Sequence, residues 1–134
     1  MEAIELVKHK NLTIETASYA TREGVQHGVI FAVQNDDEAA KEAVERVLKD
    51  KGITSLDFPF DPKEALKITS TSEKLNPKTW MFLATNRNTT HVIAVDSIFK
   101  RNEGSTEDIR LMVEALRTKG VKHTDLGFHK DQKQ

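Results

Sequence analysis

The side chains of this chain that could do chemistry are imidazoles, carboxylates, amines and hydroxyls, because the sequence contains no cysteine. Without thiols it cannot form disulfides, iron–sulfur clusters or a cysteine nucleophile. None of the five histidines belongs to a His-x-x-x-His pair, the spacing that sets two imidazoles on one helix face for zinc. The sequence therefore predicts no metal site and no cofactor.

One histidine has a carboxylate at the spacing of a strand. His123 and Asp125 are two residues apart within 121–128, which we predict as the last strand, so their side chains share one face. A carboxylate beside an imidazole can orient the ring and favour its protonated form. The two residues are therefore a candidate acid–base pair, and ordinary exposed or core-bonded side chains are the alternative.

Two polar, cationic stretches could bind an anion. Gly104-Ser105-Thr106 begins a predicted helix, where free backbone N–H groups attract negative charge, and two basic residues come just before it. The turn 86–90 is polar and cationic, and it lies between two apolar runs. Each stretch also has a plain structural interpretation, as a helix cap or a solvated loop. The candidate ligand-binding residues are Arg87, Asn88, Lys100, Arg101, Ser105 and Thr106.

Strands and helices that position these residues can be predicted from the pattern. Residues 11–20 and 25–34 are rich in β-branched and aromatic side chains and predict a hairpin, with 4–7 as a preceding edge strand. Apolar residues at helical spacing, with an acidic start and a closing glycine, predict helices over 37–51 and from Ser105 to Gly120. The other predicted strands are 53–60, 78–85, 91–99 and 121–128; of these, 78–85 and 91–99 form a second hairpin, and 61–77 is a connector.

The predicted elements repeat in order, which sets the expected fold class. The halves at about 11–60 and 78–128 each run hairpin, helix, strand, and both helices end in Lys-Gly, at Lys51-Gly52 and Lys119-Gly120. A basic last turn and a terminal glycine suit any helix, so duplication is not required. We predict an α+β fold in one domain over 1–134: a mainly antiparallel sheet from two ββαβ-like halves, with two helices packed on one face.

Residues 91–99 are largely apolar on both faces of their predicted strand. Such a strand is typical of a sheet that is covered on both sides. Because two helices cover only one face, either the first strands fold over the other face or another subunit does. We therefore expect a homo-oligomer.

Charge and composition exclude several classes of protein. The chain has 20 basic and 21 acidic side chains and no run of 18 apolar residues, so we expect neither a nucleic-acid coat nor a membrane span. Residues 1–62 carry 7 basic and 12 acidic side chains, whereas 63–134 carry 13 and 9, which makes the two parts −5 and +4. The start lacks the features of a secretory signal, so we expect a cytoplasmic protein.

Short runs are similar to two known families. Residues 36–44, the run from Trp80 and the closing 114–125 resemble the small RraB-type regulators of ribonuclease E, a resemblance that implies a non-enzymatic protein that binds and restrains a partner. That family's closing Tyr-Asp-Gly-Trp is replaced here by His-Thr-Asp-Leu-Gly-Phe. Residues 80–88 and 91–96 resemble the front of a RadC-type JAB domain, but its metal-binding His-x-His-Pro-Ser is replaced near His129 by His-Lys-Asp-Gln-Lys. We adopt neither family.

These observations favour binding over catalysis. The sequence has neither a glycine-rich phosphate loop nor Gly-x-Ser-x-Gly. Our hypothesis is a small cytosolic, non-catalytic binding or regulatory protein that acts on a protein partner or a small anionic ligand. The alternative is a nucleotide- or phosphate-binding enzyme that uses His123 and Asp125 with a basic cluster.

Overall fold

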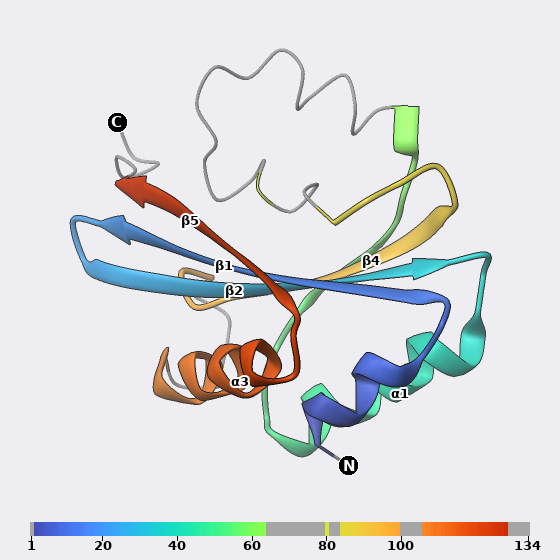
Figure 1. Cartoon of the computed structure of the whole chain (residues 1–134), viewed down its shortest axis with the longest axis horizontal. Coiled ribbons are helices and arrows are strands. Elements are labelled where there is room, and N and C mark those ends of the chain that lie inside the picture. The colour runs from blue at the N-terminus through green and yellow to red at the C-terminus, as the bar shows by residue number, and fades with distance from the viewer. Residues whose placement is uncertain (1, 64–79, 81–83, 100–105, 129–134) are drawn as a thin grey trace.

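The computed structural model describes residues 2–63, 80, 84–99 and 106–128, and these contain a five-stranded sheet in the order β3-β4-β2-β1-β5 (Figure 1). Strand β5 runs parallel to β1, and every other neighbouring pair is antiparallel. The predicted α+β class with a mostly antiparallel sheet is confirmed. The strands are β1 (Leu12–Thr21), β2 (Gly24–Gln34), β3 (Leu56–Pro59), β4 (Thr89–Asp96) and β5 (Lys122–Phe128).

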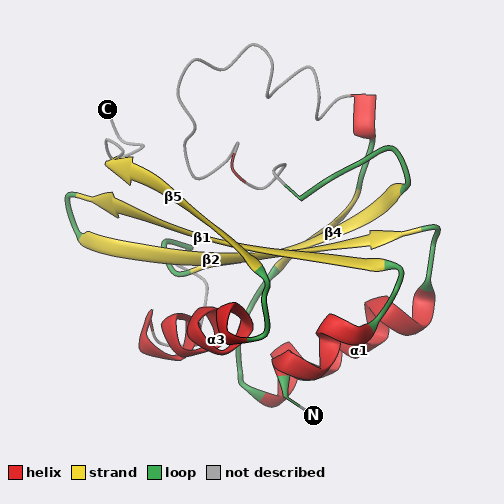
Figure 2. Ribbon diagram, viewed as in Figure 1, coloured by secondary structure: helices red, strands yellow, loops and turns green. Residues whose placement is uncertain are grey.

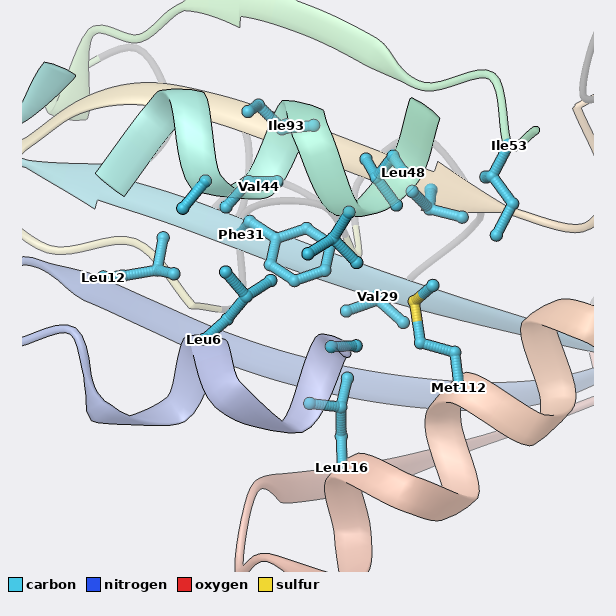
Figure 3. Packing of buried hydrophobic residues seen from close by; sticks show 14 of the residues in the cluster. Leu6, Leu12, Val29, Phe31, Val44, Leu48, Ile53, Ile93, Met112 and Leu116 are labelled. Atoms are coloured by element: carbon cyan, nitrogen blue, oxygen red, sulfur yellow. The ribbon is translucent and has the colours of Figure 1, made fainter. Parts of the chain in front are cut away.

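The helices cover one face of this sheet, as Figure 2 shows, and we refer to it as the helix face. They are the 3₁₀ helix η1 (Ala3–Lys8) and the α-helices α1 (Glu38–Asp50) and α3 (Thr106–Thr118). Their apolar stripes meet Val29, Phe31 and Ile93 from the central strands in one core (Figure 3). Burial of these stripes is the main force that holds the helices on the sheet.

Local sequence explains the best-predicted elements. In the turn between β1 and β2, the hydroxyl of Thr21 accepts the N–H of Glu23 and donates to the carbonyl of Gly24, which fixes the hairpin register. The carboxylate of Asp37 accepts the N–H of Ala40 at 3.1 Å and caps α1. That backbone hydrogen bond and one from the Asn11 amide lower the pKa of Asp37.

Three predicted elements need correction. Residues 4–7 belong to η1 rather than to an edge strand, because Leu6 packs into the core from a helical turn. The strand at 53–60 is shorter, Leu56–Pro59. The strand predicted at 78–85 falls mostly outside the described residues, and Trp80, Ala84 and Thr85 lie outside any strand. Strand β4 pairs with β2 and β3 instead, so strands of the two predicted halves interleave across the sheet.

The other face of the sheet, which we call the tryptophan face, is also buried in the single chain. Ala17, Tyr19, Ile30, Trp80 and Val92 are among the members of a second apolar cluster there. The two-sided burial predicted for the strand at 91–99 is confirmed for β4. A second subunit is therefore not needed to cover this face. In the described part of the chain, no helix is long and apolar enough to cross a membrane.

Candidate functional site

Arg87 and Asn88, two of the predicted ligand-binding residues, lie in a tightly bonded turn before β4. The Asn86 side chain accepts the N–H of Asn88 at 2.8 Å, and the Thr89 hydroxyl accepts the N–H of Asn86 at 3.0 Å. The carbonyl of Asn88 accepts the N–H of Asn35, which ties the turn to the segment before α1. The turn therefore presents an exposed Arg87 on a fixed backbone.

This turn borders a cavity of about 470 Å³, which we call the cationic cavity. Lys63 joins Arg87 in its lining, and the two cations have no ion pair with another described residue. One carboxylate, Asp61, also faces the cavity, and its Oδ1 accepts the N–H of Lys63 at 2.9 Å. The described lining residues are Asp61, Pro62, Lys63, Thr85, Asn86 and Arg87.

Most of the second predicted anion site lies outside the described residues. Lys100, Arg101 and Ser105 fall outside the described residues, and Thr106 is the exposed first residue of α3. The Arg87 turn precedes the first residue of β4, whereas the segment toward α3 leaves from its last residue. Thr106 is not among the described residues that line the cationic cavity, so Arg87 and Thr106 are not in one site.

The candidate acid–base pair lies on β5, with each member bonded elsewhere. His123 Nδ1 is 2.9 Å from Thr16 Oγ1, and the Thr16 hydroxyl donates to the carbonyl of Lys122 at 3.0 Å. Asp125 accepts the N–H of Gly127 at 2.9 Å. Among the described residues, no hydrogen bond joins His123 to Asp125 of the same chain. The two residues lie on one strand, as the sequence predicts, but the ring and the carboxylate are held by different neighbours.

A second hydroxyl–imidazole pair, which sequence reasoning missed, lies on the neighbouring strands. Ser18 Oγ is 2.9 Å from His27 Nδ1, directly across the β1–β2 ladder. Partial burial, followed by the charge of Arg110, lowers the pKa of His27. Partial burial and then Arg117 lower the pKa of His123 in the same way. Both imidazoles are therefore held neutral near pH 7, as internally bonded groups of the helix face.

A fully buried carboxylate lies on the tryptophan face. Asp96 is fully buried at the end of β4, and both its oxygens accept the Tyr19 hydroxyl, at 2.6 and 2.7 Å. The Trp80 indole N–H donates to Oδ2 at 2.8 Å, and the N–H of Ile98 donates to Oδ1 at 3.0 Å. Burial raises the pKa of Asp96 to about 6, although these donors partly offset it. Burial, and then the Asp96 charge, also raises the pKa of Tyr19.

A glycine makes room for this cluster. Gly28 lies opposite Asp96 in the β2–β4 ladder, and a Cβ at Gly28 would lie 2.1 Å from the Trp80 ring. The indole therefore packs directly on the backbone of β2. The signals for this cluster were a carboxylate on an apolar strand face and a glycine within an apolar strand, which marks close approach.

A third polar group lies where α1 meets β3 and β4. His91 Nε2 contacts the Asp57 carboxylate, and burial and then a hydrogen bond with Asp57 raise the pKa of Glu45. Two carboxylates and one imidazole could suggest metal ligands. However, no group of three or more such side chains in the described residues is arranged to hold a metal ion.

Comparisons with protein-family models, with curated proteins and with solved structures find no match for this chain. Neither of the two family resemblances gains support. The proposals below rest on the contacts and charges of the described residues.

Proposed function

We propose that this protein is a non-catalytic binding protein whose ligand is a small anion held in the cationic cavity beside the turn before β4. The observation that carries the proposal is the shared lining of this cavity by Lys63 and Arg87, which have no ion pair among the described residues. Two cations that line one cavity and form no ion pair with a described residue favour an anion between them.

The size and chemistry of the cavity support a small ligand. Its volume of about 470 Å³ is within the range of pockets that enclose small molecules. Arginine can bind a phosphate or carboxylate through two parallel N–H donors, and lysine adds a compact charge. Asn86 and Thr85 supply polar side chains on the same wall. We therefore expect a ligand that carries a phosphate or carboxylate group.

The positions of the candidate groups favour binding over the enzymatic alternative. An enzyme that combined the basic cluster with His123 and Asp125 would need them in one site. Strands β4 and β5 are separated by β2 and β1 in the sheet, which places β5 about 14 Å from β4 across the strands. Nδ1 of His123 is already hydrogen-bonded to Thr16. The pair is thus remote from the proposed anion site.

The test is titration calorimetry of the whole chain against inorganic phosphate, pyrophosphate, nucleoside monophosphates and citrate. We expect at least one of these anions to bind, with affinity that falls as salt concentration rises. Arg87→Ala should weaken that binding by about 10- to 100-fold, because it removes charge-assisted hydrogen bonds. Lys63→Ala should weaken it less, and Arg87→Lys should fall between the two because it keeps charge and loses the two-donor geometry.

Lys49→Ala is the matched control, since it removes an exposed positive charge from the far end of α1. Its affinity should equal that of the unaltered chain. Binding that is unchanged in Arg87→Ala, or equally weakened in Lys49→Ala, would contradict the site. Absence of binding by every anion in the panel would contradict the proposed function.

A further inference from the structure

The outer edge of β5 is the longer of the two sheet edges, and it has no partner strand among the described residues. The sheet ends at β5 on one side and at β3, Leu56–Pro59, on the other. Edge β3 is short and contains a proline, features that oppose pairing. Edge β5 spans Lys122–Phe128 without proline. An open strand of this kind presents backbone N–H and C=O groups that another strand can pair with.

We propose that a second copy of this chain pairs antiparallel with β5 about a two-fold axis at Thr124, so that His123 of each copy lies opposite Asp125 of the partner subunit. This would join the two sheets into one. The inference concerns a surface separate from the cationic cavity and does not rest on the proposed function.

The regular part of β5 limits the registers available to such a pair. Gly127 has a φ of 76°, in the left-handed region, and the pairing of β1 with β5 shifts between Ser18 and Ala20. Residues 122–126 are thus the part of the strand that can extend a regular ladder. A two-fold axis normal to an antiparallel pair exchanges the two strands and sets one residue opposite its own copy, so the register that pairs all of 122–126 is centred on Thr124.

Charge also favours the Thr124 register. In it, each His123 faces the partner's Asp125, so two imidazole–carboxylate pairs form by symmetry, and these carry opposite charges when the imidazole is protonated. Moving the axis one residue to Asp125 sets two aspartates against each other, and moving it to His123 sets two imidazoles together. Only the Thr124 register of these three places opposite charges across the pair.

The contacts of both residues leave atoms for the partner. His123 uses Nδ1 for Thr16, so Nε2 is the ring atom that would face the partner's Asp125. Asp125 uses Oδ1 for the N–H of Gly127, which leaves Oδ2. Asp125 is exposed and His123 is half-buried, so pairing would order a carboxylate that now faces solvent. The attraction needs the protonated imidazole, so dimerisation should strengthen as the pH falls, and it is measured from about pH 8 down to about pH 5.

Cysteine cross-linking tests the register, because the natural chain has no thiol to interfere. In the proposed dimer the two Thr124 Cα atoms lie about 4.5–5.5 Å apart, a spacing that a disulfide spans. Thr124→Cys should therefore form a covalent dimer rapidly under mild oxidation. Two other variants should cross-link at least about tenfold more slowly. Leu126→Cys would cross-link rapidly only if the two-fold axis lay at residue 126, and Lys119→Cys is an exposed control beyond α3.

A charge exchange tests the pair itself, with the dimer dissociation constant measured by analytical ultracentrifugation. His123→Asp sets like charges opposite each other twice and should raise that constant at least about tenfold. The double variant His123→Asp with Asp125→His restores opposite charges in the same register and should recover most of the loss. A monomer at all protein concentrations, faster cross-linking of the Leu126→Cys variant than of the Thr124→Cys variant, or no recovery in the double variant would overturn the proposal.

Discussion

The two faces of the sheet are both buried, but different interactions stabilise the side chains on each. On the helix face, apolar side chains of η1, α1 and α3 form the core, and Thr16–His123 and Ser18–His27 are two hydroxyl–imidazole pairs beside it. On the tryptophan face, the fully buried carboxylate of Asp96 accepts hydrogen bonds from Tyr19 and Trp80. The first face is organised by hydrophobic periodicity and the second by one polar cluster.

This difference bears on how each face tolerates change. A large apolar core loses stability in proportion to the atoms removed from it, and its neighbours partly relax. A buried hydrogen-bonded carboxylate leaves several donors without an acceptor when it is removed, so its loss is concentrated at one residue. The tryptophan face should therefore be the more sensitive of the two to a single polar substitution.

The largest effect should come from Asp96→Ala. This change removes the acceptor of the Tyr19 hydroxyl, the Trp80 indole and the N–H of Ile98 together. We expect a loss of about 3–5 kcal/mol in the free energy of unfolding, measured in urea. Asp96→Asn, which keeps one carbonyl oxygen, should lose less, and the exposed Asp50→Ala should change little. A loss no greater than that of Asp50→Ala would contradict the role given to the cluster.

Gly28→Ala should come next. The added methyl would lie 2.1 and 2.5 Å from two atoms of the Trp80 ring, so the indole must move from the backbone of β2. We expect overpacking to cost about 1–3 kcal/mol of unfolding free energy. Trp80 is the only tryptophan, so its emission should also shift to longer wavelength as the ring gains water. Gly24→Ala is no control, because Gly24 has a positive φ; Ala20→Gly in β1 serves better. Unchanged emission in Gly28→Ala would show that the ring does not pack there.

On the helix face, Thr16→Val should have a smaller effect. Thr16 is fully buried, and its hydroxyl bonds both His123 Nδ1 and the carbonyl of Lys122. Valine has nearly the same shape, so the change isolates the hydroxyl. We expect a loss of about 1–2 kcal/mol in urea unfolding, together with a change in the His123 ring resonances in NMR spectra. Ser18→Ala, at the half-buried second pair, should cost less; a larger loss there would reverse the ranking of the two pairs.

The smallest effect is a pH dependence of opposite sign on the two faces. Asp96 has a raised pKa of about 6 in the folded chain, so it binds a proton more tightly there than when unfolded. Its contribution to the unfolding free energy should rise by about 1 kcal/mol as the pH falls from 7 to 5. His27 and His123 have lowered pKa values, so they favour the folded chain above about pH 6.5 and lose that contribution as the pH falls.

Variants separate the two contributions. The difference in unfolding free energy between the unaltered chain and Asp96→Asn should grow toward pH 5, since only the unaltered chain gains from protonation of Asp96. A variant with His27→Gln and His123→Gln should lose the opposite trend. Parallel pH curves for the unaltered chain and Asp96→Asn would show that Asp96 does not titrate in this range.

Elements with a strong local pattern were predictable from the sequence. The hairpin of β1 and β2 and the helices α1 and α3 follow from alternation and helical spacing within each segment, and α1 also has its Asp37 cap. The edge strand at 4–7 was wrong, because four apolar-rich residues fit a strand or a helical turn equally well, and packing on α1 and α3 decides between them. The candidate site was found in part: Arg87 was singled out, whereas Lys63 belongs to a segment distant in sequence.

By itself, the sequence determined the secondary structure class, the absence of thiol chemistry and the residues that could carry charge to a ligand. Only the tertiary structure decided which of these residues meet. Strand order interleaves β4 between β3 and β2 and sets β5 beside β1, and no local pattern encodes that order. The strand order brings Tyr19 and Trp80 to Asp96 and Thr16 to His123. It also leaves β5 at an edge of the sheet. The physical reason is that strand pairing and burial join residues far apart in the chain, and their energy depends on the whole packed sheet.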